Sequence, residues 1–283
     1  MSLHGGNRTS VMGIMNVTPE SFSGEGILSE HDWLTAVVAQ AKSFVAEGAD
    51  ILDVGGESTR PGSTPVSLIE ELRRVVPAIK AIRAELEIAI SIDTYRARVA
   101  EAALDAGANW VNDVWGLRMD EGMAGLVAER GCPVVLMHNR SKPKEVAQEE
   151  RLGGRYVGVE YEDLIADVSR ELQESVAIAL QAGVKREQII LDPGIGFGKT
   201  VSQNARLIDE LDQIKELGFP VLLGPSRKSF IGYTLDLPPL ERLEGTAAAV
   251  TIGIDRGADI VRVHDVREIV RVAKMTDRIV RHG

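Results

Sequence analysis

The chain has 283 residues, and its 42 acidic and 32 basic side chains give a formal charge of −10 at pH 7. This acidic balance argues against a general nucleic-acid or membrane-surface binder, and the single cysteine excludes a disulfide framework and a multi-cysteine metal site. No apolar run approaches the roughly 18 residues of a membrane span, and the first residues lack a signal-peptide pattern. We therefore expect a cytoplasmic protein with no nucleic-acid or membrane partner.

Eight apolar runs along the chain are typical of strands buried on both faces. Three are expected at 11–17, 88–94 and 189–192. The other five directly follow a helical segment that ends in glycine, at Gly48, Gly107, Gly131, Gly218 and Gly257. Glycine suits the left-handed position that ends a helix, and unbroken Val/Ile/Leu runs suit strands covered on both sides.

Amphipathic segments separate these runs and predict eight helices. In 160–182, for example, apolar residues such as Leu164, Val168 and Leu172 recur at helical spacing. The predicted helices are 31–47, 66–85, 96–106, 121–130, 160–182, 203–217, 241–256 and 267–281. The charged link 139–159 is expected to be a flexible excursion.

Strands alternating with helices in this number predict an α/β fold, a (β/α)8 TIM barrel, as a single domain over 11–283. Residues 1–10 are expected to form an N-terminal extension that could derive in part from cloning. A doubly wound open sheet is the alternative, because alternation alone does not show that the sheet closes.

Polar residues stand at the ends of most predicted strands, where a barrel of this class carries its ligand site. They are Asn16, Asp53, Asp93, Asn112, Asp113, His138 (directly after Met137), Asp192, Ser226 to Ser229, Arg262, His264 and Asp265. Each alone could cap a helix or hold a loop, but buried polar groups are costly without partners, and their convergence indicates a site. Asp93, Asn112 and Asp192 suit a flat heterocycle with ring NH and exocyclic NH2 donors, such as a pterin or guanine.

A second set of residues indicates local capture of an anion. The candidates are Arg60, Arg227, Lys228, Arg262 and His264, with a helix N-terminus near Asp265. The Gly- and Pro-rich loops 18–26 and 55–65 are typical of mobile lids.

The glycine-rich segment 194–200 fails as a nucleotide-binding motif. The first glycine of a phosphate loop falls at Pro193, and the last glycine of the dinucleotide fingerprint falls at Lys199. Its glycines are instead expected to allow close approach of the backbone to a ligand. His138 is expected to be packed or hydrogen-bonded rather than a metal ligand.

Seven motifs, in chain order, resemble those of the dihydropteroate synthases, a family of pterin-binding enzymes. They are MGIMNVTPESFS (12–23), DVGGESTRPG (53–62), SIDT (91–94), ND (112–113), DPGIGFGK (192–199), GPSRKS (224–229) and RVHDV (262–266). The resemblance implies a transferase of folate biosynthesis. It condenses 6-hydroxymethyl-7,8-dihydropterin pyrophosphate with p-aminobenzoate and yields 7,8-dihydropteroate and pyrophosphate.

The same resemblance assigns residues to three substrate groups. The pterin would contact Asp93, Asn112, Met137, Asp192, Phe197, Gly224 and Lys228. The pyrophosphate would contact Asn16, Thr59, Arg262 and His264, with Asn16 also a ligand of the cofactor Mg2+. The p-aminobenzoate site, which sulfonamides would share, would comprise Phe22, Thr59, Arg60, Pro61, Lys228 and Ser229. Asp93, Asp192, Lys228 and Arg262 are the expected catalytic residues.

The resemblance also bears on oligomeric state and on whether the chain is an active enzyme. A homodimer through the C-terminal helices is expected from the resemblance alone. The first loop departs from the family pattern at Glu20, Gly24 and Glu25, which leaves open a silent pterin-binding paralogue. A pterin-dependent methyltransferase is a further alternative, disfavoured by the motifs at 57–61 and 226–229.

Overall fold

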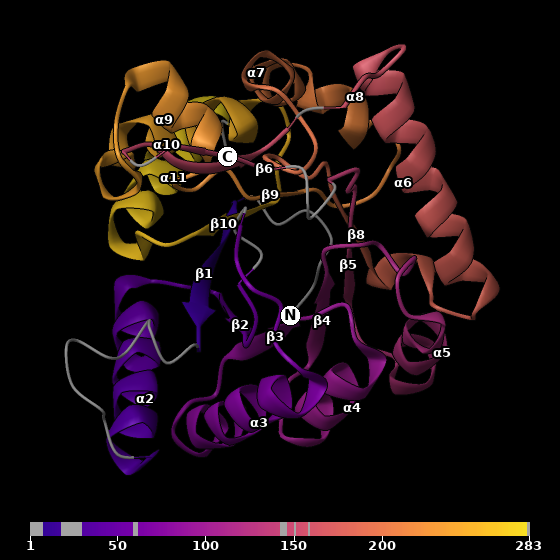
Figure 1. The fold of residues 1–283 in the computed structure, drawn as a ribbon, viewed down its shortest axis with the longest axis vertical. Helices are drawn as coiled ribbons and strands as arrows, with labels where there is room; N and C mark the ends of the chain where they lie inside the picture. Colours follow the sequence, from indigo (N-terminus) through magenta and orange to yellow (C-terminus); the bar gives the residue numbers. More distant parts are fainter. Residues whose placement is uncertain are drawn as a thin grey trace.

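The chain folds into a closed barrel of parallel strands. The computed structural model describes residues 8–17, 30–58, 62–141, 146–149, 151–157 and 159–281. The barrel strands are β1 (Ser10–Asn16), β2 (Ile51–Gly55), β3 (Ala89–Asp93), β4 (Trp110–Asp113), β5 (Val134–Met137), β8 (Ile189–Asp192), β9 (Leu222–Leu223) and β10 (Ile260–Val263). They lie in the order β8-β5-β4-β3-β2-β1-β10-β9 (Figure 1).

Contacts between β8 and β9 close this sheet into a barrel. Leu191 bridges Val221 in parallel register, and the Leu191 N–H donates to the carbonyl oxygen of Pro220 at 2.9 Å. The predicted (β/α)8 barrel is thereby confirmed, and the open-sheet alternative is wrong.

Helices surround the barrel in the predicted order. They are α2 (Glu30–Glu47), α3 (Leu68–Glu85), α4 (Ala97–Asp105), α5 (Glu121–Arg130), α6 (Leu164–Gln181), α7 (Val201–Asp209), α8 (Leu211–Lys215), α9 (Ser229–Leu235), α10 (Leu243–Asp255) and α11 (Val266–Val280). None of the helices in the described ranges is long and apolar enough to cross a membrane. The helix predicted over 203–217 is divided at Glu210 into α7 and α8, and α9 was not predicted.

Five glycines end helical segments as the sequence predicts. Their φ angles are all positive, from +60° at Gly131 to +116° at Gly107. A side chain at such a φ is strained, so glycine at these points lets the chain turn directly from helix into strand.

An apolar layer fills the barrel interior below the polar strand ends. Its members are Met12, Ile51, Trp110, Val135, Ile190, Leu222 and Ile260. Because side chains of a strand alternate between its two faces, the next inward position lies two residues further along. At four of the seven strands the residue there is polar, namely Asp53 after Ile51, Asn112 after Trp110, Asp192 after Ile190 and Arg262 after Ile260. The apolar layer is thus the floor on which a polar pocket stands.

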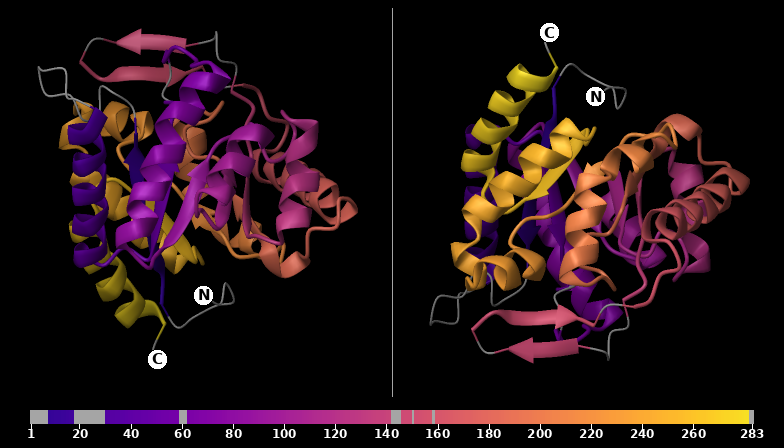
Figure 2. Two further views of the ribbon diagram at one scale, coloured as in Figure 1. Left: turned by 90° about the horizontal axis from the view of Figure 1, so that it is seen from below. Right: turned by 90° about the horizontal axis from the view of Figure 1, so that it is seen from above.

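Residues 139–159 contain regular structure, contrary to the expectation of a flexible excursion. Within them β6 (Val146–Glu149) and β7 (Gly153–Tyr156) form an antiparallel hairpin. The hairpin lies at the end of the barrel opposite the two termini (Figure 2), which is the end toward which the barrel strands run. The rings of Tyr156 and Phe197 stack with their centres 5.9 Å apart, so the hairpin packs against the loop after β8. Its strands, VAQE and GGRY, lack an apolar alternation, so no strand was predicted there.

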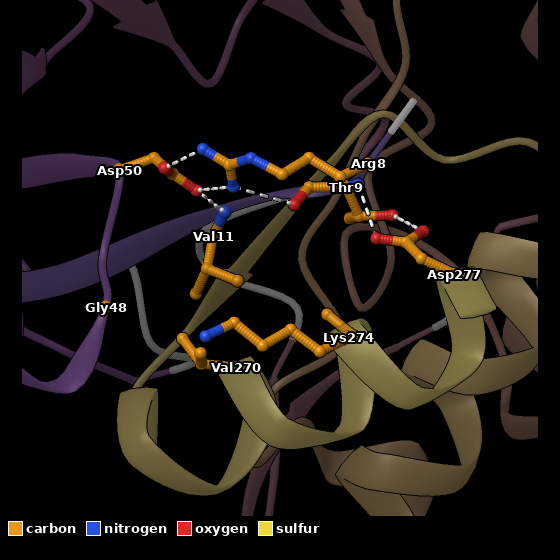
Figure 3. A pocket seen from close by; sticks show the side chains of 9 residues that line it. Arg8, Thr9, Val11, Gly48, Asp50, Val270, Lys274 and Asp277 are labelled. Carbon is orange, nitrogen blue, oxygen red and sulfur yellow. Dashed lines mark hydrogen bonds and ion pairs between the residues drawn. The ribbon is translucent and has the colours of Figure 1, made fainter. Parts of the chain in front are cut away.

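The opposite end of the barrel is fastened by residues that precede β1. Arg8 donates from Nη1 and Nη2 to the carboxylate of Asp50 at 2.9 and 2.6 Å. The Thr9 backbone N–H and hydroxyl donate to the Asp277 carboxylate at 2.7 and 2.8 Å. These side chains surround a cavity of about 330 Å³, with Lys274 on its wall (Figure 3). Arg8 is thus paired with Asp50 and Thr9 with Asp277 at the end of the barrel that serves stability in this fold class.

Candidate active site

A pocket lies on the axis of the barrel at the carboxyl ends of its strands. Its lining residues are Asn112, Val114, Met137, Asp192, Ile195, Phe197, Gly224, Lys228 and Arg262. The family resemblance assigns Asn112, Met137, Asp192, Phe197, Gly224 and Lys228 to the pterin, and the fold brings these six residues together. The cavity has a volume of about 20 Å³, which is room for about one water molecule.

Arg262 forms the central ion pairs of this pocket. Its Nε donates to Asp53 Oδ2 and its Nη2 donates to Asp93 Oδ2, each at 2.6 Å. Asn112 Nδ2 also donates to Asp53 Oδ2, at 3.1 Å. Residues from β2, β3, β4 and β10 are therefore joined by one network of charged hydrogen bonds.

Burial and neighbouring charges act in opposite directions on these groups. Burial raises the pKa of Asp93 above its usual value, although the charge of Arg262 opposes the rise. Burial on its own would lower the pKa of Arg262, but the charges of Asp53 and Asp93 outweigh burial and raise it. Arg262 therefore stays charged across the physiological pH range.

Asp192 and Lys228 form the opposite wall of the pocket. Asp192 Oδ1 accepts a hydrogen bond of 2.7 Å from the Gly194 N–H, and burial raises the pKa of its carboxyl. Lys228 Nζ lies 4.1 Å from the centre of the Phe197 ring, which is a cation–π contact. This wall presents a carboxylate, an ammonium and an aromatic face to the cavity.

Glycines of the loop after β8 make room for the chain itself. A Cβ on Gly194 would lie 1.9 Å from the His138 carbonyl oxygen, and one on Gly198 would lie 2.7 Å from the Arg140 carbonyl carbon. Both glycines also have positive φ, of +73° and +67°. Close approach to a ligand was expected, but at these two positions the close contact is with the segment after β5.

Lys199 holds the loop after β8 in place through hydrogen bonds to its backbone. Its Nζ donates to the carbonyl oxygens of Gly194 and Phe197 at 3.0 and 3.1 Å and lies 3.0 Å from His138 Nδ1. Burial and the charge of Lys199 lower the pKa of His138 to about 4, so its ring is neutral at pH 7. The other ring nitrogen of His138 then donates to Glu171 Oε2 at 3.1 Å. His138 is packed and hydrogen-bonded, as predicted.

Residues expected to bind an anion are distributed differently from the prediction. Arg227 is paired with Asp265, with Nε donating to Oδ2 at 3.0 Å. His264 is half-buried at the end of β10, with Nδ1 lying 3.0 Å from Ser226 Oγ. Arg262 is hydrogen-bonded to two carboxylates inside the pocket, and it does not lie at the rim where an anion would bind.

The remaining predicted residues divide into two groups. Asn16 is half-buried at the end of β1, and Ser229 is half-buried at the first turn of α9. Phe22, Thr59, Arg60 and Pro61, with the whole of the loop 18–26, lie outside the described residues. Among the residues that are described, no group of three or more His, Cys, Asp or Glu side chains is placed to hold a metal ion.

Three residues of the site were not assigned from the sequence. Val114 and Ile195 line the cavity, and Tyr156 stacks on Phe197. Ile195 alternates with Phe197 in the glycine-rich loop, which is a signal that both face the same way. No sequence signal marks Tyr156, because the β6–β7 hairpin that carries it was not predicted.

A closed (β/α)8 barrel with a buried, charged pocket at the carboxyl ends of its strands defines an enzyme of the TIM-barrel class. A family model described as "Pterin binding enzyme" matches residues 12–264. The chain therefore belongs to the pterin-binding enzyme family.

Within this family, the chain is most clearly similar to proteins named dihydropteroate synthase. It is 52% identical over 277 residues to a dihydropteroate synthase of Clostridium beijerinckii, covering 98% of this chain and 96% of that one. It is 49% identical to the dihydropteroate synthase of Bacillus subtilis over 98% of this chain and 90% of that one. A Clostridium difficile dihydropteroate synthase solved in the presence of pteroic acid is 48% identical, with a TM-score of 0.88 over 98% of each chain. The Xanthomonas albilineans enzyme in complex with 7,8-dihydropteroate is 38% identical, with a TM-score of 0.84 over 99% of this chain and 95% of that one.

Replacing Lys199 by Met tests its role in holding the loop after β8. The substitution leaves the Phe197 carbonyl oxygen and His138 Nδ1 without their donor, at a cost of about 1–3 kcal/mol for each unpaired group, whereas the Gly194 carbonyl oxygen keeps the Phe197 N–H. We expect a matching loss of unfolding free energy in urea titrations. Lys80→Met, at an exposed position of α3, is the control and should change little. Equal stability of the two variants would contradict the assigned role.

Proposed function

We propose that this chain catalyses the dihydropteroate synthase reaction. In it, 6-hydroxymethyl-7,8-dihydropterin pyrophosphate condenses with p-aminobenzoate to give 7,8-dihydropteroate and pyrophosphate. The observation that carries the proposal is the convergence of Asp93, Asn112, Asp192 and Lys228 around one buried site. The relatives solved with pteroic acid and with 7,8-dihydropteroate support it.

The pterin ring is recognised by hydrogen-bonding groups of matched polarity. Asp192 and Asp93 accept hydrogen bonds from ring NH and exocyclic NH2 groups, and Asn112 supplies a carboxamide. Lys228 donates to the ring oxygen or nitrogen acceptors. Met137, Phe197 and Gly224 provide apolar surface and space for a flat ring, consistent with their place on the cavity wall.

The pyrophosphate is bound at the rim of the barrel. His264 and Asn16 stand at the ends of two adjacent strands, β10 and β1, and α11 begins at Val266 with its N-terminus on the same side. Arg262 reaches this group from inside the pocket, and Thr59 is assigned to it from the sequence.

Mg2+ fits the donors present at this rim. Mg2+ usually keeps several waters and binds one or two protein oxygens together with substrate phosphates, so a dedicated cluster of acidic ligands is not needed. The Asn16 carboxamide oxygen supplies such a ligand. When bound, the ion would neutralise charge that develops on the leaving pyrophosphate.

p-Aminobenzoate is placed beside Lys228 and Ser229 at the start of α9. Lys228 would attract its carboxylate, while Phe22, Thr59, Arg60 and Pro61 are assigned to this site from the sequence. A Xanthomonas albilineans relative is solved with 4-aminobenzoic acid, and a Yersinia pestis relative with a sulfonamide drug. We infer that sulfonamides compete at the same place in this chain.

In the reaction the bond between the pterin methylene carbon and the pyrophosphate oxygen breaks first, and its electron pair leaves with pyrophosphate. The amine nitrogen of p-aminobenzoate then attacks the methylene carbon and loses a proton. Asp93 and Asp192 stabilise the electron-poor pterin between these steps, while Arg262 and His264 stabilise the leaving group. No side chain has to act as a nucleophile.

Purified protein should release pyrophosphate when supplied with the pterin pyrophosphate, Mg2+ and p-aminobenzoate, and dihydropteroate should form in equal amount. Asp192→Ala should lose this activity because the ring loses its main acceptor. Pterin binding without turnover would favour a silent paralogue. Transfer of a methyl group to a corrinoid protein would favour the methyltransferase alternative.

Replacing Lys228 by Ala should weaken both the pterin and the p-aminobenzoate site. A hydrogen bond to a charged group is worth about 1.5–3 kcal/mol, so each affinity should fall by about tenfold or more in isothermal titration. Lys274→Ala, on the cavity at the opposite end of the barrel, is the control. Retention of both affinities in Lys228→Ala would refute the assignment of this residue.

We further propose that the protein is a cytoplasmic homodimer that pairs through α10 and α11. Ile252, Met275 and Ile279 are exposed by 44, 62 and 57%, and contact between the hydroxyls of Thr251 and Thr276 places them on one face. Exposed apolar side chains that gather in this way are typical of an interface.

Met275→Glu should shift the protein from dimer to monomer in sedimentation velocity, because the charge would be buried in the interface. Ile69→Glu, on exposed α3, should leave the dimer intact. A dimer that persists in Met275→Glu would place the interface elsewhere.

A further inference from the structure

We propose that Asp53 is a positioning residue that anchors the Nε end of Arg262 while the Nη end exchanges between Asp93 and the substrate. The inference rests on the proposed function and concerns a residue that contacts the substrate only through Arg262 and Asn112.

Asp53 is fully buried, and one of its carboxylate oxygens accepts hydrogen bonds from both Arg262 and Asn112. Oδ2 accepts from Arg262 Nε and from Asn112 Nδ2 at 2.6 and 3.1 Å. Oδ1 has no hydrogen-bond partner among the described residues, and the same holds for Ser91 Oγ, which lies opposite in the β2–β3 register. A half-satisfied buried carboxylate is costly. What it provides here is a fixed negative charge beneath Arg262.

The register of the strands places the two carboxylates at different depths. Asp53 is opposite Ser91, whereas Asp93 is two residues further along β3, opposite Gly55. Asp53 is therefore one inward position deeper than Asp93. The Arg262 side chain spans the two depths. Its Nε, which is nearer the backbone, donates to the deeper carboxylate of Asp53, and its terminal Nη2 donates to the shallower carboxylate of Asp93.

A pterin ring that takes Asp93 Oδ2 as an acceptor has to compete with Arg262 for that oxygen. The cavity of about 20 Å³ holds about one water, and a bicyclic ring is several times larger. Asp93 Oδ2 is also already bonded to Arg262. Arg262 is the longest of the side chains in this network, and binding of the ring to Asp93 Oδ2 requires its guanidinium to release that oxygen.

The anchor on Asp53 determines where the released guanidinium goes. Because Nε stays on the deep carboxylate, the tip can swing only about that point, toward the ring face and the rim where pyrophosphate binds. Its charge thus remains compensated by Asp53 throughout. The motion reconciles the position of Arg262 inside the pocket with the pyrophosphate contact expected from the sequence.

Asp53→Asn tests the anchor, because it keeps the shape of the side chain and removes its charge. We expect the affinity for pteroic acid, measured by isothermal titration, to fall by tenfold or more, and the KM for the pterin pyrophosphate to rise similarly. The KM for p-aminobenzoate should stay within twofold. Ser91→Ala, equally buried and opposite in register, is the matched control and should stay within twofold in every measurement.

A double-mutant cycle shows whether Asp53 acts through Arg262. Lysine has no Nε, so Arg262→Lys removes the anchored group and keeps the charge. Adding Asp53→Asn to Arg262→Lys should then cost threefold or less, whereas independent roles would give multiplicative losses. Multiplicative losses would overturn the proposal, as would wild-type pteroic acid affinity in folded Asp53→Asn.

The same measurements distinguish misfolding of the variant from failure of the proposed function. If Asp53→Asn does not give a cooperative thermal transition, Arg262→Lys alone carries the test, and its retention of wild-type pteroic acid affinity would overturn the proposal. Failure of the wild-type protein to bind pteroic acid or to turn over would instead refute the proposed function, on which this inference rests.

Discussion

The ion pairs of Arg262 with Asp53 and Asp93 are the interaction on which the rest of the site depends. Three charged groups in a barrel interior are stable only if each compensates another, since an unpaired buried charge costs several kcal/mol. The compensation joins β2, β3 and β10 at fixed depths, and Asn112 adds β4. An apolar floor below and apolar helix faces outside keep water away from this network, which makes its electrostatic interactions strong.

A second buried cation, Lys199, shapes the opposite wall in a different way. It binds two backbone carbonyls and a neutral histidine, so its charge serves to hold a loop. The loop in turn carries Ile195 and Phe197 to the cavity and lets the Gly194 N–H donate to Asp192. The glycines that resemble a nucleotide-binding loop are explained by this packing, because a Cβ on Gly194 or Gly198 would collide with the chain after β5.

The sequence predicts features that depend on local backbone preference and on strand position. Glycines such as Gly107 mark helix ends because their φ is positive, and Asp192 and Asn112 are found by their place at strand ends. Features that depend on tertiary contacts were missed. The β6–β7 hairpin has no apolar alternation, and Arg227 was read as an anion ligand because its partner Asp265 is distant in sequence. The role of Asp53 likewise depends on the β2–β3 register and on the reach of Arg262.

The arrangement also explains how an acidic protein can favour the departure of a polyanion. Negative charge is concentrated deep in the barrel, on Asp53, Asp93 and Asp192, where an electron-poor pterin would lie. Hydrogen-bonding and dipolar groups lie further out, in His264 and the N-terminus of α11, and the tip of Arg262 can bring positive charge to them. A reaction that separates positive charge on the ring from negative charge on pyrophosphate moves each charge toward its complement. The depth difference between Asp53 and Asp93 is what allows one arginine to serve both ends of that separation.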